Sequence, residues 1–520
     1  MPGGRPGYRG GAGPARMGAD QGDAMDDHFE HLQERLPDAL AANRPGSGRD
    51  HVVVAMPSFS LSTSLLEHYG PRLPAMEHRY LNATLMLGRI DADIVFVCST
   101  EPGPEVLAYY RELVPAQTAR RMERRVHCVS VEDLSHRPLA EKLLERPDLL
   151  DEVRRLVGGR PALIEPWNVT ENEVAVATAL GIPVNGTAPE LRAEAFKSAG
   201  RRLFRRAGVP VALGREDVHT VDDVAAAAEW VRAVRPGVAA VVVKHDDSGA
   251  GDGNLVVRLL EDDGTPLDPH GVLAAVAALP AWFLDDLARG GGVVEEMVDG
   301  DRLRSPSVQV DLLPDGEVRV LATHDQVLGG ANGQVYLGCR FPADPAYAPD
   351  LARHGAAVGR ELVAKGCVGR AGVDLMAARS GAGPWSLAAL EVNLRKGGTT
   401  HPFSALRSLV PGHYDAEGGT WVSAADGTAR AYRSTDNFVD PSLAERSPRS
   451  VIDAVRDAGL QLDPASGTGV VLHMLGCLAV DGRFGATAIG TTPEHADDLF
   501  AATLAAVVPR GADAIDLAGP

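Results

Sequence analysis

The sequence predicts an α/β protein: an open parallel sheet comes first, and an α+β arrangement of hairpins and helices follows. Between residues 50 and 190, short apolar runs alternate with helical patterns, which is typical of buried parallel strands and their crossover helices. Between residues 191 and 410, apolar runs come in pairs joined by short turns, which predicts antiparallel hairpins. With 520 residues, the chain is long enough for two to four domains.

In the first region we expect buried strands in five runs: HVVVAMP, ADIVFVCST, RVHCVSVED, RPALIEP and IPVNGT. The patterns PLAEKLLERPDLLDEVRRLV and ENEVAVATALG predict helices between them. Residues 1–49 are rich in Gly, Pro and Arg and then acidic, so they are predicted to be disordered, with a short helix allowed near DDHFEHLQERL.

The second region begins with a helix in PELRAEAFKSAGRRLFRRAGVPV, and a further helix is predicted in DDVAAAAEWVRAV. The strands VAAVVVKHD and NLVVRLL flank the turn DSGAGDG, and further strands are expected in GGVVEEMVDG and PSVQVDLLPDGEVRVLATH. A C-terminal α+β region is expected over residues 411–520, with strands in GVVLHMLGCLAV and GATAIG and a closing helix in PEHADDLFAATLAAVV.

Composition and charge exclude several classes of partner. The net charge is −19, which argues against binding to a nucleic-acid backbone or an acidic membrane. The five cysteines form no C-x-x-C pair, as expected for a reducing compartment. The N-terminus lacks the apolar core of a signal peptide, and no apolar run is long enough to span a bilayer. We therefore expect a cytoplasmic protein without nucleic-acid or membrane partners.

The segment ALEVNLRKGGTTHP places three polar residues at every second position: Glu391, Asn393 and Arg395. The residues between them, Val392 and Leu394, are apolar, so the alternation has the period of a strand and the polar side chains share one face. A carboxylate, an amide and a guanidinium on a face with apolar surroundings indicate a site. The alternative is a surface hairpin with a solvated polar face.

The preceding strand carries Asp374, and the SGAGP turn between the two strands predicts a hairpin. With the turn centred near residues 381–382, Asp374 is expected opposite Ala389 to within a residue or two, one same-face step from Glu391. Asp374, Glu391 and Asn393 then form a cluster of hard oxygen ligands. Mg²⁺ prefers such ligands and completes its octahedron with substrate phosphates.

Lysine usage adds a second signal, because only five of the 51 basic residues are lysines. Lys142 and Lys365 lie in polar helical patterns and are expected to be solvated. Lys197, Lys244 and Lys396 lie beside the motifs described here, where a compact point charge suits a phosphate.

Two further segments fit a nucleotide site. Lys244 ends the strand that enters the glycine-rich turn at residues 248–254, whose free N–H groups can fold over phosphates, although a plain glycine-rich hairpin is the better explanation of this segment taken alone. The segment GGVVEEMVDG offers apolar walls and carboxylates for an adenosine. No P-loop motif occurs in the chain.

In chain order, these pieces resemble the ATP-grasp superfamily over about residues 185–403. Lys197 and Lys244 resemble its phosphate lysines, residues 248–254 its phosphate flap, and VVEEMVDG its nucleotide hinge. Asp374, Glu391 and Asn393 resemble its metal ligands. Arg395 extends the pattern to E-x-N-x-R, as in biotin carboxylases and carbamoyl-phosphate synthetases. The chain has no M-K-M biotin-carrier motif, so a carboxylase is not expected.

The remaining motifs are similar to a narrower group, the pheganomycin-type peptide ligases. The matching segments are MPSFS, MEHRYLNATLMLG, VFVCSTEP, LEVNLRKGGTTHPF, GVVLHMLGCL and GATAIG. The resemblance implies a pre-ATP-grasp domain at residues 50–190, an ATP-grasp domain at 191–410 and a C-terminal region at 411–520.

The resemblance implies an ATP-dependent carboxylate–amine ligase that works through an acyl phosphate and releases ADP and phosphate. Its implied cofactors are ATP and one or two Mg²⁺ ions, with Mn²⁺ as an alternative. Its implied substrates are a small carboxylate and an amine, such as an amino acid or short peptide, and a homodimer is an open alternative. A ligase with a non-amine acceptor and a non-catalytic nucleotide-binding protein also stay open.

The resemblance assigns roles to individual residues. Arg395 and Lys244 are the expected catalytic residues, and Asp374, Glu391 and Asn393 are the expected metal ligands. The expected nucleotide-binding residues are Lys197, Lys244, Ser248, Gly249, Gly251, Gly253, Glu295, Glu296, Met297 and Val298. Five more residues lie near the site in sequence and are equally well explained as structural: His324, Gln326, Tyr336, Arg340 and His401. His473, in an apolar strand, is expected to be a core histidine.

Overall fold

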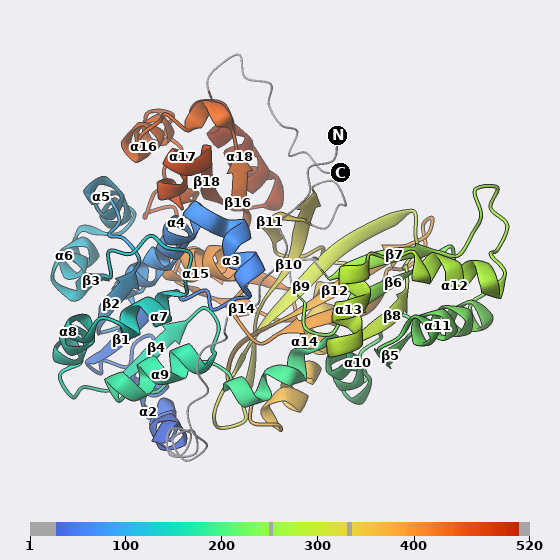
Figure 1. Cartoon of the computed structure of the whole chain (residues 1–520). Helices are drawn as coiled ribbons and strands as arrows, with labels where there is room; N and C mark the ends of the chain where they lie inside the picture. The colour runs from blue at the N-terminus through green and yellow to red at the C-terminus, as the bar shows by residue number, and fades with distance from the viewer. Residues whose placement is uncertain (1–27, 249–252, 330–334, 509–520) are drawn as a thin grey trace.

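The computed structural model describes residues 28–248, 253–329 and 335–508, which build three sheets (Figure 1). The first sheet is parallel, with the order β3-β2-β1-β4. Its strands are β1 (His51–Met56), β2 (Ala92–Cys98), β3 (Val126–Ser130) and β4 (Ala162–Pro166). Every residue of β1 is buried, so the predicted open parallel sheet with continuous apolar strands is confirmed.

Helices surround this sheet: α2 (Leu36–Ala42), α3 (Thr63–Tyr69), α4 (Leu73–Glu77), α5 (Pro104–Glu112), α6 (Ala116–Arg125), α7 (Leu139–Leu144), α8 (Pro147–Val157) and α9 (Glu171–Leu180), with 3-10 turns at Gly70–Arg72 and His78–Gly88. The helix predicted over residues 138–157 is divided, because Arg146 is non-helical before Pro147. The strand predicted in IPVNGT is wrong. Only Val184 bridges to Ile164 there, since the neighbouring Pro183 has no N–H to extend a ladder.

The prediction of disorder up to residue 49 is wrong for the described part of that segment. Residues 28–33 are helical, as the allowed short helix near DDHFEHLQERL anticipated, and α2 follows. Phe29, Leu32 and Leu36 are buried, and the Gln33 side chain bonds both backbone groups of Val184. This apolar face and the side-chain bonds attach the segment to the parallel-sheet domain.

The second sheet is antiparallel, with the order β5-β8-β6-β7. Its strands are β5 (Gly214–Val218), β6 (Ala240–His245), β7 (Asn254–Arg258) and β8 (Gly292–Glu296), and its helices are α10 (Lys197–Arg206), α11 (Val221–Val234), α12 (Pro269–Ala277) and α13 (Ala281–Gly290). The helix predicted from Pro189 is broken at Phe196, which is extended, after a 3-10 turn at Pro189–Ala195. The break places Lys197 at the first position of α10.

The third sheet has ten strands and lies between the other two in Figure 1. Its strands are β9 (Arg302–Leu312), β10 (Val318–Gly329), β11 (Val335–Phe341), β12 (Gly369–Arg379), β13 (Ser386–Asn393), β14 (Gly412–Asp415), β15 (Thr420–Ser423), β16 (Ala429–Val439), β17 (Gly469–His473) and β18 (Arg483–Gly490). Its helices are α14 (Ala348–Val363), α15 (Thr400–Leu409), α16 (Pro448–Asp457), α17 (Leu478–Asp481) and α18 (Pro493–Val507), with 3-10 turns at Pro441–Leu443 and Leu475–Cys477.

The C-terminal strands belong to this large sheet. Strand β16 pairs with β11, and β18 pairs with both β16 and β17. A domain boundary near residue 410 therefore stays a prediction. The strand predicted through GVVLHMLGCLAV ends at His473, because Met474 adopts a left-handed conformation with φ of 55° and starts a 3-10 turn.

In the described part of the chain, no single helix is long and apolar enough to cross a bilayer. Only α12 and α13, bent by 95°, pass such a test when they are taken together.

Candidate active site

Asp374 and Glu391 occupy paired positions on β12 and β13, so the predicted hairpin is confirmed. The expected register places Asp374 opposite Ala389 to within a residue or two, and the observed register differs by two residues. One of them arises in the turn, because Leu375 pairs with Ala389, and the other arises at a bulge. A β-bulge between Asp374 and Leu375 leaves Leu390 without a partner and moves Glu391 opposite Asp374. The bulge therefore brings the two carboxylates directly against each other. Along β12, buried positions alternate with half-buried ones, and Asp374 is on the half-buried face.

Amide groups surround the two carboxylates. The Asn393 side chain donates to Asp374 Oδ2 at 3.1 Å and to Glu391 Oε1 at 3.3 Å. From β10, Gln326 Nε2 donates to Asp374 Oδ1 at 2.9 Å. The structure thus brings together all three predicted metal ligands and adds Gln326.

Lys197 connects this cluster to the second sheet. Its ammonium lies 3.0 Å from Glu391 Oε2 and donates to the Ser248 carbonyl at 2.8 Å. The side chain is 7% exposed, so the charge is held in a protected position rather than in solvent. Lys197 therefore lies between a predicted metal ligand and the start of the predicted phosphate flap.

The two carboxyls have opposite pKa shifts. Burial and the facing Glu391 carboxylate raise the pKa of Asp374 to about 7. Burial also acts to raise the pKa of Glu391, but the Lys197 ammonium and its hydrogen bond outweigh burial and lower that pKa. Two carboxyls at such close range favour sharing one proton unless a cation joins them.

Arg395 lies in the bend that follows β13, two residues after Asn393. Its positive charge acts to lower the pKa of both Asp374 and Glu391, which places the guanidinium near the pair. Its one hydrogen bond to a described residue goes from Nη1 to the Lys396 carbonyl at 3.1 Å. Most of its donors are therefore available to a ligand.

Lys244, the second predicted phosphate lysine, ends β6 beside Glu295 of β8. The Lys244 ammonium lies 2.5 Å from Glu295 Oε2, and Arg201 of α10 contacts the other carboxylate oxygen. Burial acts to raise the pKa of Glu295, but the two cations lower it below its usual value. Glu295, which is 2% exposed, thus positions the lysine.

Arg201 was not anticipated from the sequence. It is 1% exposed and also bonds Glu216 and the Ala212 carbonyl. A usable signal was present, because Arg201 comes four residues after Lys197 and so shares its helix face.

Three of the other predicted nucleotide-binding residues lie at the end of β8 or directly after it. Glu296 accepts from the Leu213 N–H at 2.9 Å and pairs with Arg235 at 2.6 Å. Met297 is 51% exposed and Val298 is half-buried. Ser248 and Gly253 flank the tip of the glycine-rich turn, whereas the predicted residues Gly249 and Gly251 lie outside the described residues.

The other three lysines differ in exposure and in the groups that they contact. The expectation of a solvated Lys142 is wrong, because it is 2% exposed and donates to the Ser99 hydroxyl and to the Asp133 and Ser135 carbonyls. Lys365 forms an accessible ion pair with Glu194. Lys396 points away from the carboxylate pair and binds Glu165 and the Pro166 carbonyl in the parallel-sheet domain.

Among the residues near the site in sequence, only some lie in it. Gln326 lies in the site, where it bonds Asp374. The Tyr336 ring packs against Gly398 so closely that a Cβ atom added at position 398 would lie 2.5 Å from the ring. Arg340 instead contacts Asp497. His324 is buried against the Tyr432 hydroxyl at 2.6 Å, and burial lowers its pKa to about 3.

His401 and His473 form a buried pair. Their Nε2 atoms lie 3.0 Å apart, and burial lowers the pKa of each ring. The expectation of a core histidine at position 473 is confirmed.

The donor set at Asp374, Glu391 and Asn393 fits Mg²⁺. It supplies two carboxylates and an amide, and within the described residues no three His, Cys, Asp or Glu side chains gather as a closed metal site. Mg²⁺ commonly takes one or two carboxylates and completes its shell with water and phosphate oxygens. A cation between the paired carboxylates would also replace the proton that they otherwise share.

Comparisons with known proteins agree with this geometry. A family model described as the PGM1 C-terminal domain matches residues 450–503. The L-propargylglycine–L-glutamate ligase of Streptantibioticus cattleyicolor is 33% identical over 425 residues, which are 78% of this chain and 83% of that protein. The chain belongs to the pheganomycin-type ATP-grasp ligases. As a member of these ligases, it is an ATP-dependent enzyme that joins a carboxylate to an amine.

Other proteins match this pheganomycin-type ligase over only part of its sequence or in fold alone. The IQ motif-containing protein H of Danio rerio is 25% identical over 304 residues, 48% of this chain and 29% of that protein. Among solved structures, the biotin carboxylase domain of Hydrogenobacter thermophilus 2-oxoglutarate carboxylase has a TM-score of 0.52 at 14% identity, covering 88% of this chain and 89% of its own. Biotin carboxylase of Campylobacter jejuni has a TM-score of 0.52 at 13% identity, covering 88% and 91%. These two structures show the ATP-grasp fold.

Proposed function

We propose that this protein joins the carboxylate of one amino acid or short peptide to the amine of another. The observation that carries the proposal is the paired carboxylates of Asp374 and Glu391, with Lys197 and Arg395 beside them. The Streptantibioticus relative is named for two amino acids, propargylglycine and glutamate, which supports this substrate class. A homodimer stays a prediction.

The proposed roles follow from the positions of the charges. Lys197 and Lys244 would bind the ATP phosphates, with Glu295 and Arg201 holding Lys244 in place. Asp374, Glu391 and Asn393 would hold Mg²⁺, or Mn²⁺, which neutralises phosphate charge when it is bound. Met297 and Val298 would line the adenine, and Ser248 and Gly253 would support the phosphate flap.

Phosphoryl transfer needs positioning and charge neutralisation more than a nucleophile from the protein. The substrate carboxylate would attack the γ-phosphate of ATP and release ADP, which leaves an acyl phosphate. The amine would then attack the acyl carbon, and phosphate would leave as the amide forms. The Arg395 guanidinium is suited to holding two oxygens of the acyl phosphate, because its donors form a planar fork.

A screen of ADP release tests the proposal, with amino acids and short peptides offered as acid and amine together. We expect ADP release only when both substrates and Mg²⁺ are present, and a product whose mass equals the two substrates minus one water. A product of that mass that hydroxylamine cleaves, as it cleaves esters and thioesters but not amides, would favour the non-amine acceptor. ATP binding without ADP release for any pair would favour a non-catalytic protein.

A further inference from the structure

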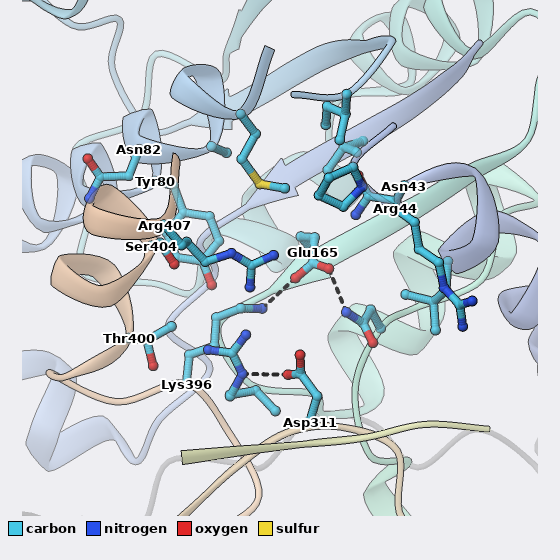
Figure 2. Close-up of a pocket in the computed structure, with 18 of the residues that line it drawn as sticks. Asn43, Arg44, Tyr80, Asn82, Glu165, Asp311, Lys396, Thr400, Ser404 and Arg407 are labelled. Carbon is cyan, nitrogen blue, oxygen red and sulfur yellow. Dashed lines mark hydrogen bonds and ion pairs between the residues drawn. The ribbon is translucent and has the colours of Figure 1, made fainter. Parts of the chain in front are cut away.

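A cavity of about 250 Å³ lies between the parallel-sheet domain and the large sheet (Figure 2). We call it the interdomain cavity. Its walls come from β1 and β2 with the adjoining 3-10 turn, from β9 and β12, and from α15. Residues 396–400, which connect the end of β13 to the start of α15, are called the signature loop here, and Lys396 and Thr400 at its two ends also line the cavity. None of the roles proposed above uses this cavity.

The signature loop separates the interdomain cavity from the carboxylate pair. Ser307 and Asp311 lie on the same face of β9. Ser307 bonds Asp374, whereas Asp311 lines the cavity. The two residues are four positions apart, which is about 13 Å along a strand. Between them, the buried Gln309 side chain bonds Thr399 and Thr400. The cavity is therefore a second site, distinct from the place of phosphoryl transfer.

The charge of the cavity is opposite to that of the protein. Six basic side chains line it but only three acidic ones, in a chain with a net charge of −19. The basic residues are Arg44, Arg79, Arg319, Arg370, Lys396 and Arg407, and the acidic residues are Glu165, Asp311 and Asp315. Arg79 and Arg319 are paired with Asp436 and Glu317, which lie outside the lining, so the positive charge available to attract an anion is that of Arg44 and Arg407.

Two of these basic groups, Arg44 and Arg407, have no ion pair or side-chain hydrogen bond to a described residue, and of the two Arg44 is exposed whereas Arg407 is half-buried. Arg370 is bonded to Asp311 and Lys396 to Glu165, but no described residue forms an ion pair or hydrogen bond with the Arg407 guanidinium. Figure 2 shows this guanidinium extending from α15 toward Glu165 and Lys396. Burial and the nearby Arg370 lower the pKa of Arg407, although the Asp311 and Glu165 carboxylates act in the opposite direction without bonding to it.

Two other residues of the lining bury polar atoms without a described partner. Asn82 Oδ1 and His401 Nδ1 accept or donate no hydrogen bond within the described structure, although the two residues are 3% and 6% exposed. Buried polar atoms are paired in most proteins, so unpaired ones around a cavity indicate a missing ligand or water.

We propose that the interdomain cavity binds the carboxylate of a small molecule of the amino-acid or short-peptide class, with Arg407 as its anchor. The choice of class rests on the proposed function, whose substrates and product all carry carboxylates. An Arg fork binds a carboxylate through two parallel hydrogen bonds. Glu165 and Asp311 would repel the second charge of a phosphate but would tolerate the ammonium of a zwitterion.

Isothermal titration calorimetry without ATP tests this site, with L-alanyl-L-alanine and its C-terminal amide as probes. We expect the wild type to bind the free dipeptide, and Arg407→Gln to bind it about tenfold or more weakly. Arg120→Gln, which changes an exposed arginine on α6, is the matched control and should bind as the wild type does. The C-terminal amide should bind as weakly to the wild type as the free dipeptide does to Arg407→Gln.

Two variants separate this proposal from folding and from catalysis. Ser404→Phe fills the cavity from α15 and should also abolish binding, which keeps the test valid if Arg407→Gln does not fold. Glu391→Gln should bind the dipeptide normally even though it has lost ADP release. Four results would overturn the proposal. In the first, the wild type does not bind the dipeptide. In the second, Arg407→Gln binds it as tightly as the wild type does. In the third, the wild type binds the C-terminal amide as tightly as the free dipeptide. The fourth is tighter binding of inorganic phosphate than of the dipeptide to the wild type.

Discussion

The carboxylates of Asp374 and Glu391 face each other across β12 and β13, and the Lys197 ammonium lies 3.0 Å from the second of them. The bulge that leaves Leu390 unpaired produces this alignment. Because of burial, and because the two carboxyls are this close, the pKa of Asp374 is raised to about 7 and the pair tends to share a proton in the absence of a metal cation. A metal cation held between the two carboxylates would replace that proton.

Replacing Lys244 with Met should weaken both ATP binding and folding. The loss removes a proposed phosphate contact, so we expect about tenfold or weaker ATP binding by calorimetry. It also leaves the buried Glu295 with Arg201 as its remaining cation, which should lower the free energy of unfolding by about 1–3 kcal/mol.

Lys365→Met is the matched control for Lys244→Met. Lys365 pairs with Glu194 where solvent screens the charges, so its loss should cost about 0–1 kcal/mol and leave ATP binding unchanged. Equal ATP affinities for wild type and Lys244→Met would return Lys244 to a structural role.

Replacing Arg395 with Lys should lower kcat by about 100-fold or more and leave the KM for ATP nearly unchanged. The ammonium keeps the charge but loses the planar fork that would hold two oxygens of the acyl phosphate. Steady-state kinetics with varied ATP separates the two parameters. Normal turnover, or a defect confined to ATP binding, would place Arg395 away from the reacting groups.

The stability of the parallel-sheet domain should depend on the protonation of Glu77. Burial raises the pKa of Glu77 to about 7, although its carboxylate accepts from the Ser99 N–H at 2.6 Å and the Ser99 hydroxyl at 2.8 Å. Between the ordinary value of 4.5 and about 7, the folded protein therefore binds more protons at Glu77 than the unfolded chain. Stability falls as pH rises wherever the folded state binds more protons.

Glu77→Gln removes this titration while keeping a side chain that can still bond Ser99. Between pH 5 and pH 7.5, the wild type should lose about 1–3 kcal/mol of unfolding free energy relative to Glu77→Gln in urea titrations. Glu445→Gln, an exposed substitution, should show no such change. Parallel pH profiles for wild type and Glu77→Gln would show that Glu77 does not titrate in this range.

The alternation in ALEVNLR was enough to predict the strand and that the Glu391 and Asn393 side chains lie together, whereas their role as metal ligands stays a prediction. The register was not predictable, because it depends on one residue in the turn and on a bulge at Leu390, and neither has a signal in the alternation of the strand. Likewise, the buried Lys142 looked like any helical lysine. The carbonyls that hold it belong to the segment after β3, which only the tertiary fold brings close.

The N-terminal segment was misjudged for a similar reason. Phe29, Leu32 and Leu36 form an apolar face, but the surrounding composition is that of a disordered segment. The helix is held by packing on the parallel-sheet domain and by Gln33 at Val184, neither of which is visible in local sequence. Arg201 was missed although its spacing from Lys197 was a readable signal.

The central claim is that the Asp374–Glu391 pair holds the metal that supports ATP-dependent ligation. ADP release by wild type and Glu391→Gln, with an acid and an amine that the wild type joins, tests it most directly. We expect Glu391→Gln to keep the wild-type circular dichroism spectrum and to lose ADP release by about 100-fold or more, because one metal ligand and the partner of Lys197 are gone. Glu445→Gln should keep full activity. Wild-type rates in Glu391→Gln at the same Mg²⁺ concentration would contradict the account.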